Sequence, residues 1–213
     1  MVDWDWIFGH LDDIGEALSE HLLLTGLAVG VGFALSFAAA LVIHRRRALY
    51  GPITAFAGIV YTIPSLALLA FLVPLTGLSV LTAEIALVSY TLLILIRNIM
   101  AGLDSVPPEM REAADGMGYT QWQRLWRVEF PLALPVIVAG LRVATVTTIG
   151  LVTVTALIGQ GGLGGLMIRG FIRQFDTLIY VGAVLSVLLA IIADLALLLV
   201  QRAITPWTRM RTG

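Results

Sequence analysis

The chain has 213 residues, of which 59% are hydrophobic and 13% are charged, and its formal net charge is -1. Because soluble domains are usually about 25% charged, this composition, with a mean hydropathy of +0.95, indicates a protein whose solvent is mostly lipid. Cysteine and lysine are both absent, which excludes disulfides, thiolate metal sites and the lysine-dependent phosphate-binding loop of ATP-hydrolysing proteins.

The first apolar segment, 22–43, contains no charged residue and is long enough to cross a bilayer as a helix. It is followed by a basic stop, His44 to Arg47, whereas the segment 1–21 before it is acidic. Secretory signal peptides have the opposite order, with the basic region first. We therefore expect an uncleaved first span and an extracytoplasmic N-terminal segment at 1–21.

Four further spans are expected, at 53–73, 79–98, 132–157 and 177–201. Pro64 lies inside the first of these and should kink it, while Pro74 with Gly77 predicts the turn that follows. The pattern predicts an all-α polytopic membrane protein with five transmembrane helices in one domain, 22–202.

The arginines indicate the orientation of these spans. Ten of them share one side of the membrane if the N-terminus lies outside: Arg45, Arg46, Arg47, Arg97, Arg111, Arg124, Arg127, Arg202, Arg209 and Arg211. Only Arg169 and Arg173 would lie on the other side, and Arg142 lies within a span. Because positive residues concentrate in cytoplasmic loops, we expect the N-terminus outside and a cytoplasmic C-terminal tail, 203–213.

A helix over 108–117 is expected in the longest cytoplasmic loop, 104–131. Two consecutive prolines suit its first turn, and Asp104 or Ser105 is the expected cap. Gly118 suits the left-handed residue that ends a helix.

Small and polar residues on this helix suggest a surface for a partner. Ala113 and Ala114 would form a face with almost no side chain, so that a partner's backbone could approach. Arg111, Glu112 and Asp115 would supply polar contacts around that face. The alternative is a solvated loop whose charges only determine the topology.

Two tryptophans follow the helix one turn apart. Trp122 and Trp126 alternate with Arg124 and Arg127. Aromatic rings and arginines together favour the headgroup zone of a bilayer, so this segment is expected at the membrane surface.

The same loop carries a spaced motif, which consists of Glu112-Ala113-Ala114, three residues, Gly118, nine residues, and then Val128, Phe130 and Pro131. This order resembles the E-A-A, three residues, G, nine residues, I-x-L-P motif of ABC importer permeases, with apolar replacements at two positions. The resemblance implies the core of type I importers, similar to methionine permeases, over 22–202. It also implies a coupling helix that docks in a groove of a cytoplasmic ATPase. The residues implied in this coupling are Arg111, Glu112, Ala113, Ala114, Asp115, Gly116, Met117 and Gly118.

Three further segments resemble, more closely, the permeases for quaternary-amine osmoprotectants such as glycine betaine, choline and carnitine. They are TIPSLALLAFLVPLTGL (62–78), LPVIVAGLRVATVTTIG (134–150) and ALIGQGGLGG (156–165). The resemblance implies an ATP-driven importer of the bacterial inner membrane, in which this chain is a multi-pass subunit and not an enzyme.

Such an importer implies several partners. Two copies of an ABC ATPase would bind ATP and Mg²⁺, so no cofactor or metal is expected in this chain. A second permease subunit, identical or paralogous, would complete the path, and an extracytoplasmic binding protein would deliver the solute; nucleic acid is not an expected partner. Two alternatives remain open: the permease of a methionine or amino-acid importer, and a gradient-driven secondary transporter, which would need buried titrating groups or an inverted repeat.

Gly159, Gly161 and Gly164 satisfy the G-x-G-x-x-G pattern of dinucleotide-binding folds. That motif requires a strand-turn-helix unit in a soluble domain, whereas here it follows a membrane span. We therefore expect a compact re-entrant or docking loop instead of a nucleotide site. The three histidines are too far apart in the sequence to predict a metal site.

Ionisable residues inside the spans are candidates for the translocation path or its gate. Arg142 and Asp194 have opposite charges at similar expected depths, so they form either a gate contact or an ion pair that braces two helices. Glu84, near the outer boundary, is expected to be solvated.

Residues around the proline of the second span are also candidates for the path. Pro64 removes a helical hydrogen bond. Thr62 and Ser65 beside it would either satisfy the freed backbone groups or line the path.

Overall fold

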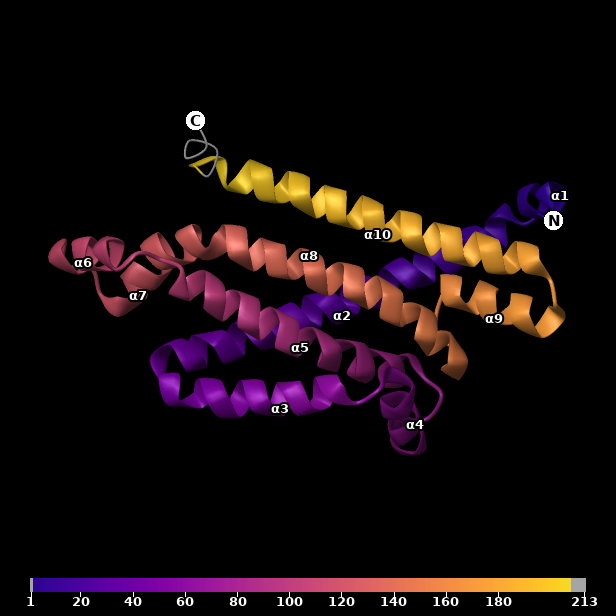
Figure 1. The fold of residues 1–213 in the computed structure, drawn as a ribbon, viewed down its shortest axis with the longest axis horizontal. Helices are drawn as coiled ribbons and strands as arrows, with labels where there is room; N and C mark the ends of the chain where they lie inside the picture. The colour runs from indigo at the N-terminus through magenta and orange to yellow at the C-terminus, as the bar shows by residue number, and fades with distance from the viewer. Residues whose placement is uncertain (1, 208–213) are drawn as a thin grey trace.

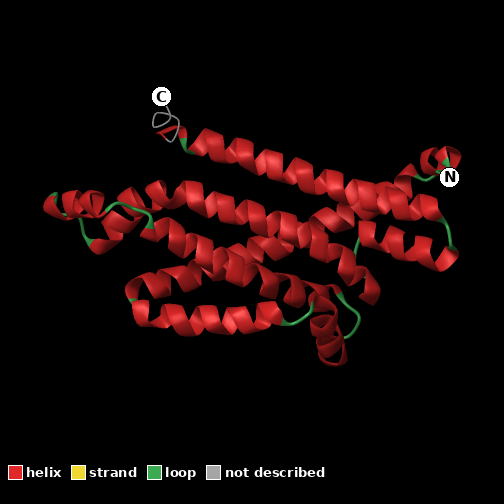
Figure 2. Ribbon diagram, in the orientation of Figure 1, coloured by secondary structure: helices red, strands yellow, loops and turns green. Residues whose placement is uncertain are grey.

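The computed structural model describes residues 2–207, which form helices and connecting loops without a strand (Figures 1 and 2). The all-α class is therefore confirmed over this range. Arg209, Arg211 and most of the expected tail lie outside the described residues. In chain order the elements are α1 (Trp4–Gly9), α2 (Leu11–Arg45), η1 (Arg47–Leu49), α3 (Tyr50–Thr62), α4 (Ser65–Thr76), α5 (Val80–Asp104), α6 (Pro108–Gly116), α7 (Gln121–Arg124), η2 (Leu125–Glu129), α8 (Phe130–Thr155), η3 (Ala156–Ile158), α9 (Leu163–Arg173) and α10 (Asp176–Ile204).

Four helical units within 2–207 are long and apolar enough to cross a membrane: α2, α5, the continuous α7–η2–α8–η3 unit and α10. Counting the bent pair α3–α4 as one span gives five. In Figure 1, α6 and α7 lie at one end of the bundle, and α1 and α9 lie at the other.

The span expected at 53–73 is not one straight helix. α3 ends at Thr62, α4 begins at Ser65, and the two helices are bent by 94°. Ile63 between them is extended, which is the conformation favoured before a proline, and Pro64 has no N–H to continue the helical ladder. The expected kink is thus a full break, and α4 turns away from the bundle axis (Figure 1).

Two helices begin earlier than hydropathy predicts. α2 begins at Leu11 instead of 22, because its acidic first turn is favourable at a helix N-terminus although it is not apolar. The helix expected from 132 begins at Gln121 and passes through η2, a π-helical turn in which the Phe130 N–H bonds to the Leu125 carbonyl. Hydropathy reports contact with lipid and does not report where a helix starts.

The core lies where α2, α5 and α8 pack against one another. The buried face of α2 is rich in small residues, including Ala28, Gly32, Ser36 and Ala40, which allow helices in a membrane to approach closely. The cluster of buried side chains that includes Ile43, Leu95, Ile99, Leu125 and Ile137 joins these three helices toward the α6 end.

α10 packs along α8 and α9 on one side of the bundle (Figure 1). The most apolar part of this helix contains no buried residue. Its outward surface therefore has the character of a surface that meets lipid or a second subunit.

Candidate functional site

The short helix expected in loop 104–131 is α6, which projects from one end of the bundle (Figure 1). Pro108 occupies its first turn, where a missing N–H costs no hydrogen bond. Gly118 has a φ of +79°, a left-handed conformation that glycine adopts without strain, and it turns the chain after the helix. The expected cap is wrong: Pro107 precedes the helix, no side chain caps it, and Asp104 is the last residue of α5.

The exposed face of α6 differs in part from the expected one. Glu112 and Ala113 are exposed, as are Gly116 to Gly118, but Ala114 is 0% exposed and packs inward. Met110 and Met117 are 45% and 65% exposed. Since positions 110, 113 and 117 share one side of a helix, α6 presents a stripe of two methionines around an alanine. Methionine side chains adapt to irregular partner surfaces, so this stripe suits docking.

Arg111 makes contacts within the chain. Its Nη2 donates to the Leu103 carbonyl at 2.7 Å, and its Nε lies 3.7 Å from Oε1 of Glu129. The side chain therefore holds α6 against the end of α5 and the start of the next membrane helix, and its contact with a partner stays a prediction.

Arg124 joins α6 to the helix that follows it. Its Nη1 donates to both carboxylate oxygens of Asp115, at 2.6 and 2.7 Å, and its Nε donates to Glu129 at 2.8 Å. Asp115, expected to meet a partner, is thus bonded within the chain. These charge-assisted bonds fix the C-terminal end of α6, and the contacts of Arg111 fix its middle.

Glu129 lies at the centre of these contacts, with a side chain that is 1% exposed. His44 at the end of α2 places Nε2 at 3.4 Å from its second oxygen. A buried carboxylate is costly unless it has such partners, and removing one is strongly destabilising. We name Glu129, His44, Arg111 and Arg124 the Glu129 cluster. The sequence does not predict it, and its signal is an acid between Val128 and Phe130 in an otherwise apolar run.

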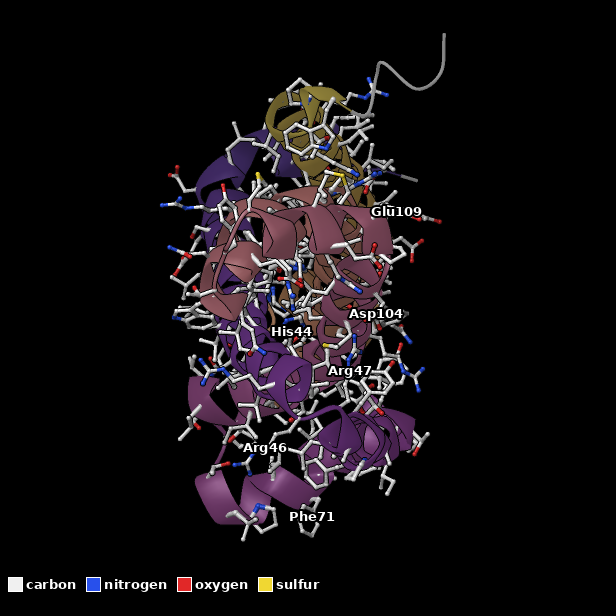
Figure 3. All side chains as sticks on the ribbon, turned by 90° about the vertical axis from the view of Figure 1, so that its left-hand side faces the viewer. His44, Arg46, Arg47, Phe71, Asp104 and Glu109 are labelled. Carbon is white, nitrogen blue, oxygen red and sulfur yellow. The ribbon has the colours of Figure 1, made fainter. Side chains whose placement is uncertain are left out.

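A second ion pair fastens the same end of the bundle. Arg47 in η1 donates through two guanidinium nitrogens to the carboxylate of Asp104 at the end of α5. Figure 3 shows these two side chains next to each other, with Arg46 apart from them and Glu109 at the outer edge. Side chains of α2, η1, α5, α6 and η2 are thus tied together at this end of the bundle.

The expected path residues near the proline lie at the break between α3 and α4. Thr62 is exposed, and its hydroxyl donates to the Ile59 carbonyl at 2.7 Å. The hydroxyl therefore bonds to a backbone group of its own helix, α3. Pro64 is exposed and Ser65 is half-buried. The Tyr90 hydroxyl of α5 donates to the Ile63 carbonyl and so fastens the break to the core.

Arg142 and Asp194 come together, as their opposite charges and depths predict. Nε and Nη2 of Arg142 each lie 2.8 Å from a carboxylate oxygen of Asp194. Nη1 reaches Gln201 at 3.4 Å, and Gln201 donates in turn to the Pro135 carbonyl at 2.9 Å. This chain of polar contacts joins α8 to α10 at several points, which favours the bracing interpretation.

Glu84 is not solvated in this structure, contrary to expectation. Both of its carboxylate oxygens are buried, and neither has a hydrogen-bond partner among the described residues.

Within residues 2–207, no three histidine or acidic side chains are arranged to hold a metal ion.

The glycine-rich segment connects η3 to α9 and packs against α2. The Gly161 N–H donates to the Glu20 carboxylate at 3.1 Å. Gly162 has a φ of +48°, and a Cβ there would lie 2.4 Å from the Ala17 carbonyl oxygen. The glycines therefore allow close approach of backbone to backbone, and no strand precedes them in the described chain.

The sequence and the structure are both similar to those of known proteins. The family model described as "Binding-protein-dependent transport system inner membrane component" matches residues 30–210. The chain is 40% identical to the osmoprotectant import permease protein OsmW of Salmonella typhimurium, over 95% of this chain and 98% of that protein. It is 37% identical to the glycine betaine/carnitine/choline transport system permease protein OpuCB of Bacillus subtilis, over 90% of each. A chain of the MetNI methionine ABC transporter, in an inward-facing crystal form, matches with a TM-score of 0.80 and 25% identity over 88% of this chain and 94% of that one.

Proposed function

The chain belongs to the family of binding-protein-dependent transport system inner membrane components, and from that premise we propose that it is the permease subunit of an ATP-driven importer for a quaternary-amine osmoprotectant. Glycine betaine, choline and carnitine are the candidate solutes. Relatives with osmoprotectant and betaine functions are 40% and 37% identical, whereas the methionine transporter chain is 25% identical. This difference favours an osmoprotectant over methionine.

The observation that carries the proposal is the construction of α6. Its outer side is a small, exposed surface around Ala113, and its inner side is fixed to the bundle by the Glu129 cluster. A helix that is free on one side and rigidly held on the other suits a partner that pushes or pulls it. We assign that outer side to the groove of a cytoplasmic ABC ATPase.

ATP and Mg²⁺ belong to the ATPase in this proposal. The chain has no lysine and therefore cannot form the phosphate-binding loop that such hydrolysis uses. Two ATPase copies would close on ATP and carry two α6 helices with them.

Hydrogen bonds would transmit a movement of α6 to the membrane helices α5 and α8. Arg111 connects it to the last turn of α5, and Arg124 connects it to the start of α8. Because α5 and α8 pack closely along their length, the two helices would tilt together. Such tilting would alternate access to a path between the two sides of the membrane.

A second permease subunit, which would complete the path, is part of the proposal. The break at Pro64 leaves α4 with exposed apolar side chains, among them Phe71 at 70% and Leu75 at 69%. This surface and the outer side of α10 are available for a second copy or a paralogue. An extracytoplasmic binding protein would deliver the solute at the end of the bundle opposite α6.

Uptake of labelled glycine betaine into proteoliposomes that contain the chain, its ATPase and its binding protein tests the proposal. Uptake that requires ATP and is competed by choline or carnitine is the expected result. Uptake driven by an ion gradient without ATP would identify a secondary transporter. Uptake of methionine without betaine would reassign the solute.

A further inference from the structure

A basic cleft of about 500 Å³ lies beside the Glu129 cluster, between the end of α2 and the α7–η2 segment. Four arginines line it: Arg45, Arg47, Arg111 and Arg124. We propose that this cleft binds the phosphate group of an anionic phospholipid. The proposal goes beyond the transport function and does not depend on which solute is carried.

The charge of the cleft suits one phosphate. Three carboxylates offset the four arginines. Glu129 lines the cleft beside Arg111 and Arg124, while Asp104 and Asp115, which do not line it, pair with Arg47 and Arg124. One positive charge therefore remains. That charge belongs to Arg45, which has no carboxylate within ion-pair distance in the described part of the chain. Arginine presents planar donors that match phosphate oxygens.

Arg45 is also held in place to receive such a group. Its guanidinium lies over the Trp122 ring, 4.7 Å from the ring centroid. A cation stacked on an aromatic face keeps its N–H donors free at the edge. Among the described residues that line the cleft, the buried Nε of Arg111 makes no hydrogen bond but lies 3.7 Å from Oε1 of Glu129, so the exposed Arg45 is the arginine left to receive an added anion.

The position of the cleft identifies a lipid as the source of the phosphate. The buried apolar face of α2 ends at Ile43, and the cleft begins one residue later at His44. Trp122 and Trp126 are 47% and 42% exposed beside it, and tryptophan is enriched at the membrane-water interface. Basic pockets at the ends of membrane helices are typical sites for anionic headgroups. A lipid bound here would connect the end of α2 to the segment that carries α6.

Thermal unfolding of the full chain in detergent tests this site. Phosphatidylglycerol, phosphatidylcholine or inorganic phosphate is added to the wild type, Arg45→Gln and Arg46→Gln. Arg46 is the matched control, because it is the next residue, carries the same charge, does not line the cleft and lies apart from Arg47 and Asp104 (Figure 3). Phosphatidylglycerol should raise the melting temperature of the wild type and Arg46→Gln but not of Arg45→Gln, and phosphatidylcholine should raise none of them.

Three other outcomes would overturn the proposal. Equal responses of both variants to phosphatidylglycerol would mean a diffuse charge effect. If inorganic phosphate raises the melting temperature in a way that depends on Arg45, the cleft binds a soluble phosphate anion and not a lipid. Loss of the Arg45-dependent rise after addition of the partner ATPase would mean that an acidic segment of that protein occupies the cleft. If Arg45→Gln does not fold, Arg45→Lys against Arg46→Lys provides the comparison, with weaker retention of phosphatidylglycerol in native mass spectrometry expected for Arg45→Lys alone.

Discussion

Nε of Arg124 donates a hydrogen bond of 2.8 Å to the carboxylate of Glu129. The Glu129 side chain is 1% exposed, and Glu129 is the last residue before α8 begins. The same arginine bonds Asp115 near the end of α6. One side chain therefore joins the projecting helix to a membrane helix, and under the proposed function this contact would pass a displacement of α6 to α8.

Removing the charge of Glu129 tests this connection. Glu129→Gln keeps the size of the side chain but leaves Arg111 and Arg124 without their shared carboxylate. Because breaking a buried pair is costly, we expect a loss of about 3 kcal/mol in unfolding free energy, together with ATP hydrolysis that no longer drives uptake. Chemical denaturation in detergent measures the first effect, and a transport assay measures the second. Glu109→Gln, on the exposed first turn of α6, should change neither; equal effects of the two substitutions would contradict the account.

Two neighbouring alanines offer a matched pair on α6. Ala113 is exposed, whereas Ala114 is 0% exposed. Ala113→Trp should leave the yield of folded protein unchanged but prevent co-purification of the ATPase, because the bulky ring blocks docking. Ala114→Trp should lower the folded yield itself, since overpacking a filled site typically costs about 1–3 kcal/mol. Retention of the ATPase by the Ala113 variant would count against docking on this side.

The pair between Arg142 and Asp194 predicts a rescue. Asp194→Asn leaves the arginine unpaired within a span, where an isolated charge is unfavourable, and should lower the melting temperature. Arg142→Gln in the same chain removes the orphaned charge and should restore much of the loss. A thermal shift assay on both single variants and the double variant measures the coupling. Additive effects of the two substitutions would show that the pair does not brace α8 to α10.

The glycine-rich segment provides a test of packing at the opposite end. Gly162→Ala should destabilise the chain by about 2 kcal/mol, because its φ of +48° and its contact with the Ala17 carbonyl leave no room for a Cβ. Gly165→Ala is the control, since the nearest atom to its added Cβ is the end of the Arg169 side chain at 3.8 Å. Thermal unfolding in detergent compares them, and a tolerated Gly162→Ala would mean that the loop does not dock on α2 as described.

Much of the fold was predictable because its determinants are local. Apolar stretches report lipid contact, and the positive φ of Gly118 follows from the need to end α6 within one turn. The pairing of Arg142 with Asp194 was predictable from charge and depth, because an unpaired charge within a span is unfavourable. The break at Pro64 was predictable in position, but its 94° angle and the bond from the Tyr90 hydroxyl to the Ile63 carbonyl depend on contacts with another helix, which the local sequence does not show.

The orientation of side chains on α6 was not predictable in the same way. Arg111 and Asp115 are polar residues on a short helix, and the sequence alone does not show that Arg124 and Glu129 satisfy them from the next segment. Ala114 and Ala113 are identical residues, so only the packing of the whole bundle decides which one is exposed. Glu84 is a second example. Its position near the outer end of a predicted span led us to expect a solvated carboxylate, whereas the carboxylate is buried.

Site-directed cross-linking tests the central claim most directly, because the chain contains no cysteine and one introduced cysteine is unique. Ala113→Cys places a thiol on the exposed side of α6, and Arg173→Cys places one on α9 at the other end of the bundle. In an assembly that hydrolyses ATP, a short thiol-directed cross-linker should join the first variant to the ATPase and leave the second unlinked. An active assembly in which position 113 never links to the ATPase, or in which position 173 does, would contradict the assignment of α6 as the coupling helix.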